Sequence, residues 1–361
     1  MKILMIRTDF TTPFRLKYDL YGGVGYYRII KPAQYLKKLG HEITVMGRPP
    51  EQERNRPSFW RELAEQHDVI FAKHIDNKAV IDELLKSKKP IIMDFDDNLF
   101  AVDELSPHKF AYPEGSEKKE TVVNFIKQAK AITVATEPLV NVYKQWNDNV
   151  YVLPNYCDID DWNYEPKKNP DGRITIGWIG SASHIPDHEM MIPVFQKLIK
   201  IFGNKIIFSF MGHLTYDISN ALPRVNFCGS SGVDGWEGHP EQPISFPALL
   251  AEQEYDIGIA PLKDSEFNRS RSASKWYEYS MLKIPTVASD LEPYRTIKHG
   301  VDGLLAKTQD EWIENLSKLI NNETLRQQYG NAAYKRITGD YQYADHGYLW
   351  DKVCRKAVNS D

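Results

Sequence analysis

The chain has little cysteine and little excess charge of either sign. Its 361 residues include three cysteines, Cys157, Cys228 and Cys354, and no two of them form a CxxC pair. The sequence therefore predicts neither a zinc knuckle nor a disulfide framework, and a reducing compartment is the simplest expectation. Basic residues number 45 and acidic residues 49, so the net charge is -4 and no nucleic-acid partner is expected.

Long apolar segments are missing as well. No run of about 18 apolar residues occurs, so no membrane-spanning helix is predicted. The opening segment MKILMIRTDF has no small-residue cleavage site and fits a buried strand better than a signal peptide. We therefore expect a cytoplasmic protein, with peripheral contact at the inner membrane surface left open. P-loop and HExxH motifs are also absent from the sequence.

Short apolar runs alternate along the chain with segments of helical periodicity, which is typical of a parallel sheet covered by helices. The first series of predicted strands comprises residues 2–6, 42–46, 68–72, 90–95, 131–135 and 150–155. The second series comprises residues 174–180, 205–212, 224–229, 255–262, 284–290 and 303–306.

Two features divide and complete this pattern. Residues 163–172 are polar and rich in Pro, Asn and Lys, as in a linker. Two similar series joined by one linker predict two Rossmann-like α/β domains that face a cleft. Apolar spacing predicts one helix from Tyr26 to Leu39 and another over residues 191–202.

Glycine-rich turns follow the first strand of each series. Gly22 and Gly23 precede the first helix, and Gly180 and Ser181 follow strand 174–180. Small residues there let backbone N–H groups approach a phosphate or a sugar, although a plain turn explains them as well. Neither turn has the GxGxxG spacing of a dinucleotide site.

His184 stands at the end of the second turn, where it can donate to a phosphate or a donor sugar. A histidine satisfied within its own loop is the common alternative. Asp187 and His188 lie close by in sequence and suggest a metal site, but a fourth ligand is missing.

The segment 268–279 lies between two predicted strands of the second series. Arg271, Lys275 and Glu278 are spaced to share one helical face. Two cations and one carboxylate suit a nucleoside diphosphate, because the cations meet phosphate and the carboxylate accepts from ribose hydroxyls. A solvated helix with an ordinary ion pair is the alternative.

Carboxylates cluster after strand 90–95. Asp94, Asp96 and Asp97 repel one another and need a cation, hydrogen bonds or raised pKa values. A divalent metal, hydroxyls of a sugar and a helix cap are all compatible with them. His74 ends the preceding strand, and we favour an acceptor contact for His74, Asp96 and Asp97.

Residues 275–290, KWYEYSMLKIPTVASD, resemble the C-terminal signature of family 4 type retaining glycosyltransferases of the GT-B fold. Glu278 and Pro285 match that signature, as do residues 288–290. A subgroup with an IGWxGSxxH turn resembles the chain further, at residues 176–184 and 267–279. The family pattern has a Glu where this chain has Ser270, and the subgroup lacks that Glu too.

This resemblance implies an acceptor-binding domain at residues 1–165 and a nucleotide-sugar domain at 166–338. A C-terminal helix at 339–361 would return to the first domain. Implied catalytic residues are His184, Arg271, Lys275 and Glu278; implied donor-binding residues are Gly22, Gly23, Gly180, Ser181, Ser274 and Tyr279.

The implied reaction transfers a sugar from a UDP- or GDP-linked donor to a glycan, a lipid-linked acceptor or another hydroxyl, as in cell-surface polysaccharide synthesis. Anomeric configuration would be retained. No cofactor is obligatory, and Mg²⁺ stays open but is not expected. Three alternatives remain: a nucleotide-sugar 2-epimerase, a non-catalytic nucleotide-sugar-binding protein, and a metal-dependent transferase that uses the Asp94 cluster.

Overall fold

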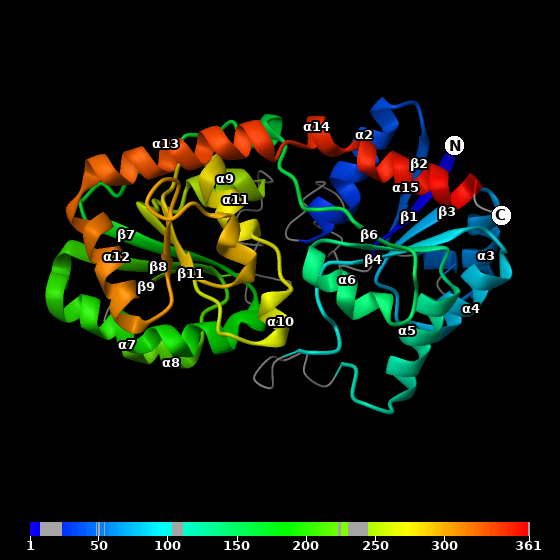
Figure 1. Cartoon of the computed structure of the whole chain (residues 1–361), viewed down its shortest axis with the longest axis horizontal. Helices are drawn as coiled ribbons and strands as arrows, with labels where there is room; N and C mark the ends of the chain where they lie inside the picture. The colour runs from blue at the N-terminus through cyan, green and yellow to red at the C-terminus, as the bar shows by residue number, and fades with distance from the viewer. Residues whose placement is uncertain are drawn as a thin grey trace.

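A computed structural model describes residues 1–7, 24–47, 49, 51–53, 55–102, 111–222, 225–229 and 245–359. Gly22 and Gly23 lie outside the described residues. Figure 1 shows two lobes, each built on its own sheet with helices on both faces. None of the described helices is both long enough and apolar enough to cross a membrane.

The first sheet has six parallel strands in the order β2-β1-β3-β4-β5-β6. These strands are β1 (Lys2–Ile6), β2 (Glu42–Met46), β3 (Val69–Lys73), β4 (Ile91–Phe95), β5 (Ala131–Val134) and β6 (Val150–Val152). The helices among them are α2 (Lys31–Lys38), α3 (Ser58–Glu65), α4 (Lys78–Lys86), α5 (Glu117–Gln128) and α6 (Glu137–Lys144). Helices cover both faces, which explains why β3 and β4 are apolar along most of their length.

The second sheet also has six parallel strands, in the order β12-β11-β10-β7-β8-β9. Its strands are β7 (Ile174–Gly180), β8 (Ile206–Gly212), β9 (Val225–Gly229), β10 (Ile257–Ala260), β11 (Thr286–Ser289) and β12 (Leu304–Ala306). The helices are α7 (Ile185–Phe202), α8 (Tyr216–Ala221), α9 (Phe246–Ala251), α10 (Glu266–Arg269), α11 (Ser274–Met281), α12 (Gln309–Asn321) and α13 (Glu323–Asp340). All twelve predicted strands are confirmed, with small shifts at their ends.

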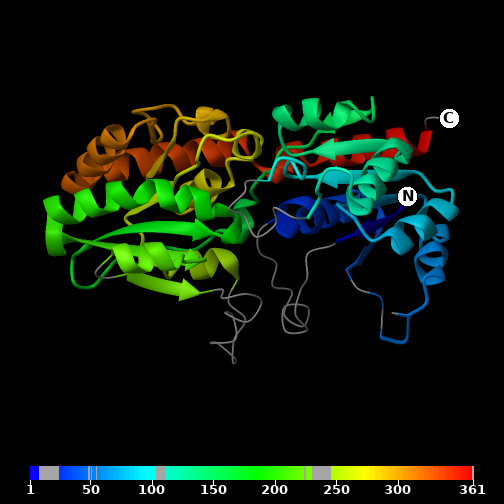
Figure 2. The ribbon, with the colours of Figure 1, turned by 90° about the horizontal axis from the view of Figure 1, so that it is seen from below.

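The C-terminal helices return to the first lobe. After α13 the chain crosses over through α14 (Tyr343–His346), and α15 (Tyr348–Asn359) packs on α2 and β3. Trp350 and Cys354 of α15 are fully buried in the core of the first sheet. Figure 2 shows the same helix on the first lobe when the molecule is seen from below.

The two crossings between the lobes pair with each other at Cys157. Its N–H donates to the carbonyl of Tyr341 at 2.9 Å, and its own carbonyl accepts from the N–H of Tyr343 at 2.7 Å. The residues that connect the lobes thus form one short junction of two backbone segments.

Two helix predictions need correction. The helix expected from Tyr26 begins as a wider π-helical turn over Tyr26–Ile30 before α2 continues it. This turn carries Tyr27 and Arg28, both buried, and their polar ends bond to groups outside the helix. The helix expected at 191–202 begins earlier, at Ile185, because Pro186 is well suited to a first turn.

Candidate active site

The predicted functional residues of the second lobe gather at the carboxyl ends of its strands. His184 follows β7, and Lys275 lies in α11, which follows β10. The edge of the first sheet faces them: Thr136, after β5, donates to the carbonyl of Ser270 at 2.6 Å. In open α/β sheets the carboxyl ends of the strands are where ligands bind.

Lys275 is a buried cation at the centre of this group. Its Nζ lies 2.7 Å from Nε2 of His184 and 5.7 Å from the centre of the Trp178 ring. Burial and, less strongly, the nearby Arg271 lower the pKa of Lys275 to about 7. Removing an ammonium from water is costly, so the site gains from any anion that contacts Nζ.

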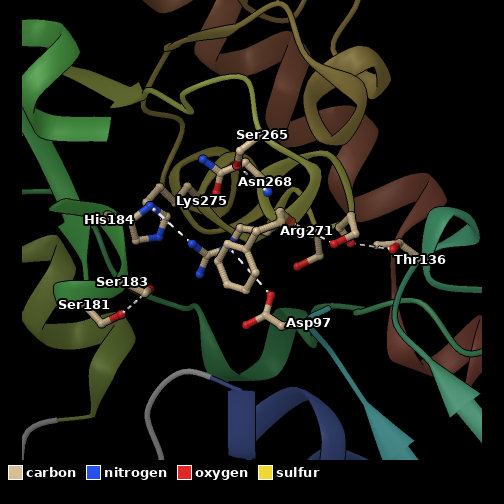
Figure 3. Close-up of polar contacts among 12 residues, drawn as sticks. Asp97, Thr136, Ser181, Ser183, His184, Ser265, Asn268, Arg271 and Lys275 are labelled. Atoms are coloured by element: carbon tan, nitrogen blue, oxygen red, sulfur yellow. Dashed lines mark hydrogen bonds and ion pairs between the residues drawn. The ribbon is translucent and has the colours of Figure 1, made fainter. Parts of the chain in front are cut away.

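Arg271 links this group to the first lobe. Its Nη1 lies 3.4 Å from Nδ1 of His184, and its Nε lies 3.7 Å from Oδ1 of Asp97 (Figure 3). The expectation that Arg271 shares a helical face with Lys275 and Glu278 is wrong in one respect. Since α11 begins only at Ser274, Arg271 lies in the loop before it. The loop nevertheless brings Arg271 to the same imidazole that Lys275 contacts from α11.

Glu278 lies one turn after Lys275 in α11 and is buried. Its Oε1 accepts a hydrogen bond of 3.0 Å from the hydroxyl of Tyr27, a residue of the first lobe. Burial raises the pKa of Glu278 to about 7, although Lys275 and the Tyr27 hydroxyl offset part of the rise. A second hydroxyl could replace Tyr27 as the donor to this carboxylate.

His184 is neutral in this setting, because burial and the two cations lower its pKa well below the usual value. Its Nδ1 lies 2.6 Å from Oδ2 of Asp187, which is itself fully buried. His184 is therefore held on both ring nitrogens.

The glycine turn before His184 is fixed by packing. A Cβ at Gly180 would lie 2.5 Å from the Trp178 ring and 3.1 Å from His184, so a larger residue would displace both. Ser181 and Ser183 are linked through their hydroxyls at 2.9 Å. Ser181 is exposed in this turn.

Two predicted donor-binding residues differ in their setting. Ser274 begins α11 and is half-buried beside Lys275. The structure does not bring Tyr279 into the group: it is fully buried, and its hydroxyl donates to the carbonyls of Gly177 and Ile259, each at 3.3 Å. Tyr279 packs beneath the sheet, where a Cβ at Gly258 would collide with its ring.

The three aspartates of the acidic cluster in the first lobe, Asp94, Asp96 and Asp97, have different surroundings. Asp94 is fully buried and paired with Arg28, with an Nε to Oδ2 distance of 3.0 Å. This pairing contradicts the hypothesis of a metal site that includes Asp94. Asp96 and Asp97 lie beyond the strand and are half-buried, and burial raises the pKa of Asp97 while Arg271 lowers it.

His74 lies at the end of β3 with a left-handed φ of 31°. Its Nε2 lies 2.5 Å from the hydroxyl of Tyr112, which donates to Asp76 at 2.7 Å. Burial lowers the pKa of His74 to about 4, so the ring is neutral at physiological pH.

A metal ligand set is not found within the described part of the chain, where no three His, Cys, Asp or Glu side chains converge. His184 and Asp187 bond to each other, and His188 packs 4.1 Å from the Trp178 ring centre. The alternative of a metal site at these three residues is therefore not supported.

Sequence reasoning missed two contributors, Tyr27 and Thr136, and considered Asp187 only as a metal ligand and not as a partner of His184. Tyr27 and Thr136 contact the candidate active site from the first lobe, and no local sequence pattern predicts either contact. Asp187 had one available signal, because a residue three positions after His184 at a helix start can reach its ring.

Comparison with known proteins establishes the fold. No protein-family model and no curated protein matches the sequence. The crystal structure of Anabaena HepE in complex with UDP and glucose matches with a TM-score of 0.65 at 13% identity, over 99% of this chain and 100% of HepE. A glycosyltransferase from Rickettsia africae matches with a TM-score of 0.64 at 12% identity, over 100% and 99% of the two chains.

Sucrose-phosphate synthase from Thermosynechococcus elongatus is similar as well, with a TM-score of 0.64, 10% identity and coverage of 99% of this chain and 98% of its own. At such identities the likeness concerns the fold. The chain has the GT-B fold: two Rossmann-like α/β units, with a C-terminal helix that returns to the first.

Proposed function

We propose that this protein is a glycosyltransferase that moves a sugar from a UDP- or GDP-linked donor to a hydroxyl acceptor with retention of configuration. The observation that carries the proposal is the pair of cations at the carboxyl edge of the second sheet, the buried Lys275 and the half-buried Arg271, which both contact the His184 ring. HepE, a structural neighbour, binds UDP and UDP-glucose in its crystal structures, which favours uridine among the bases.

The chemistry needs such cations. When the bond between sugar and diphosphate breaks, negative charge grows on phosphate oxygens while the sugar becomes oxocarbenium-like. Arg271 and Lys275 stabilise that charge, helped by the backbone N–H groups of the turn at Gly180 and Ser181. The leaving phosphate oxygen takes the proton of the acceptor hydroxyl on the same face. Since the cations supply the positive charge, we expect transfer without Mg²⁺.

Each lobe would hold one substrate. Glu278 accepts hydrogen bonds from ribose hydroxyls, exchanging its Tyr27 partner for one of them. Asp97, whose Oδ1 lies 3.7 Å from Nε of Arg271, faces the donor site from the first lobe, and together with Asp96 and His74 it would hold a glycan or lipid-linked acceptor. A cytoplasmic location, with acceptors reached at the inner membrane surface, belongs to the same proposal.

Thermal unfolding in the presence of UDP, GDP, ADP, CMP and dTDP, each with and without Mg²⁺, tests the donor site. A ligand at 100 times its Kd stabilises the folded state by about 2.7 kcal/mol, so binding of one diphosphate will be visible as a higher Tm. No shift with any of the five nucleotides would contradict the proposal.

Turnover separates the remaining alternatives. With UDP-glucose or GDP-mannose, a transferase releases the nucleotide, and EDTA leaves its rate unchanged. A 2-epimerase would convert the donor without any acceptor. A non-catalytic binding protein would show the thermal shift and no release.

A further inference from the structure

Asp187 is a buried carboxylate beside the proposed donor site, and the reaction as described above gives it no role. It lies in the first turn of α7 and is fully buried. Oδ1 accepts from the backbone N–H of Lys263 at 2.7 Å and from Nδ2 of Asn268 at 2.8 Å. Oδ2 faces Nδ1 of His184 at 2.6 Å. Three separate segments thus meet at one carboxylate.

The direction of each hydrogen bond can be assigned. Nδ2 of Asn268 also donates to the carbonyl of Lys263 at 2.9 Å, so the amide nitrogen, and not its oxygen, faces Asp187. An ionised carboxylate only accepts, so Nδ1 of His184 must carry the ring proton. Nε2 is then an acceptor, which is what the ammonium of Lys275 requires at 2.7 Å. Asp187 and Lys275, the nearest neighbours of the two ring nitrogens, thus demand the same tautomer. Nη1 of Arg271 is a donor that also faces Nδ1, but at 3.4 Å its contact is much weaker than that of Asp187 at 2.6 Å.

We propose that Asp187 is a positioning residue that holds His184 in its Nδ1–H form, so that Nε2 fixes the ammonium of Lys275 and turns its other N–H groups toward the donor diphosphate. The inference rests on the proposed function for the diphosphate, but the tautomer itself does not. The buried aspartate of a Ser-His-Asp triad orients its histidine by the same bond.

Asp187→Asn tests the assignment with little change of shape. The amide oxygen takes the place of Oδ1, because two N–H donors converge there. The amide NH2 group then faces Nδ1, which must become an acceptor, and the ring proton moves to Nε2. That N–H points at the Lys275 ammonium, so an attraction becomes a repulsion.

Asn268→Ala is the matched control. It removes one donor to the same carboxylate and disturbs the same loop, but it leaves the charge of Asp187 and its bond to His184 in place. We expect Asn268→Ala to keep the wild-type tautomer.

Long-range ¹H–¹⁵N spectra of the full chain labelled with ¹⁵N-histidine report the tautomer directly, with His184→Gln to assign the signal. At pH 6.5 Asp187, whose pKa burial raises to about 6, is mostly ionised, and Lys275, whose pKa burial lowers to about 7, is mostly charged. At this pH we expect the Nδ1–H form in the wild type and in Asn268→Ala, and the Nε2–H form in Asp187→Asn. An Nε2–H form in the wild type, or an unchanged form in Asp187→Asn, would overturn the proposal. This measurement requires no donor.

Titration with UDP between pH 6 and pH 9 adds a functional readout. The charged and titratable groups around Lys275 are Arg271, Glu278, Asp97, Asp187, His184 and His188, and Asp187→Asn changes one of them. Loss of the carboxylate lowers the pKa of Lys275 and moves the alkaline loss of affinity to lower pH; a shift of one unit weakens binding about tenfold above pH 7.

Asn268→Ala should keep the wild-type profile. If Asp187→Asn also keeps it, Asp187 is structural only and the proposal fails. If the wild type binds no UDP at any pH, UDP-sugars are excluded as donors in the proposed function. The spectra still decide the tautomer of His184, because they need no donor.

Discussion

Two buried cations at equivalent edges of the two sheets have opposite surroundings. Arg28, in the first lobe, donates to both oxygens of Asp94 and to the backbone carbonyl of Leu153. Lys275, in the second lobe, contacts the neutral ring of His184. The pKa of Arg28 is raised by Asp94 in spite of burial, whereas burial lowers that of Lys275.

The comparison separates a structural charge from a functional one. Arg28 is saturated by the protein itself, and Trp350 packs 5.6 Å from its guanidinium carbon. Among the described residues, His184 is the single hydrogen-bond partner of Lys275 Nζ. The carboxylates of Asp187, Glu278 and Asp97 act on it without forming a direct ion pair, and the neighbouring Arg271 adds to the positive charge. A buried cation without a direct counter-ion is a site that an anion would complete.

Arg28→Met should therefore have the largest effect on stability. It leaves Asp94 buried without its counter-charge, and breaking such a pair costs about 3–5 kcal/mol. Urea unfolding followed by far-UV circular dichroism measures the loss. A change below about 1 kcal/mol would mean that Asp94 is protonated or solvated once Arg28 is gone.

Lys275→Met should reduce activity without reducing the stability of the folded state, unlike Arg28→Met. The folded state should be as stable as the wild type or more so, because a desolvated charge is replaced by an apolar chain. Release of nucleotide from the sugar donor should fall by about 10²–10³, as for loss of one preorganised donor to the developing charge. Normal release rates in Lys275→Met would remove Lys275 from the phosphate site.

Tyr27→Phe should moderately reduce stability and change the pH dependence of UDP binding, because it removes a hydrogen bond between the two lobes. Its hydroxyl donates to the buried carboxylate of Glu278, and loss of such a donor costs about 1–3 kcal/mol. Since the same bond lowers the pKa of Glu278, the acidic loss of UDP affinity should move to higher pH. Unfolding and UDP titration on the same samples measure both effects, and an unchanged pH profile would argue against Glu278 as a donor contact.

The pH dependence of the wild type is the smallest effect. Burial lowers the pKa of Lys275 to about 7, and a bound diphosphate would raise it again, so affinity for UDP should fall as pH rises above 7. Burial raises the pKa of Glu278 to about 7, so protonation should weaken ribose binding as pH falls below 7. Calorimetric titration of the wild type from pH 5 to pH 9 should show a maximum near neutrality, and affinity that does not fall above pH 7 would argue against Lys275 as a phosphate contact.

The strands could be predicted because they are buried on both faces. Runs such as residues 174–180 have few polar positions, so their apolar character is visible without an alignment. The π-helical turn at Tyr26–Ile30 could not be predicted in this way. Its polar contacts run to Glu278 and Asp94, residues far away in the sequence.

The site was predictable in part for the same reason. His184, Lys275 and Arg271 stand in local motifs after strands, and the structure brings them together. The bond between Tyr27 and Glu278 joins residues 251 positions apart, beyond any local pattern. Tyr279 was expected at the donor site because it shares the motif of Lys275, but its side chain is buried in the core.

Thermal unfolding of the wild type and Lys275→Met side by side, with the panel of five nucleotides, tests the central claim most directly. We expect one nucleoside diphosphate to raise the Tm of the wild type and to leave that of Lys275→Met unchanged, while without ligand the variant is at least as stable. Equal shifts in both proteins, or a variant that is much less stable without ligand, would contradict the claim that Lys275 is a buried cation without a direct counter-ion that binds the donor phosphate.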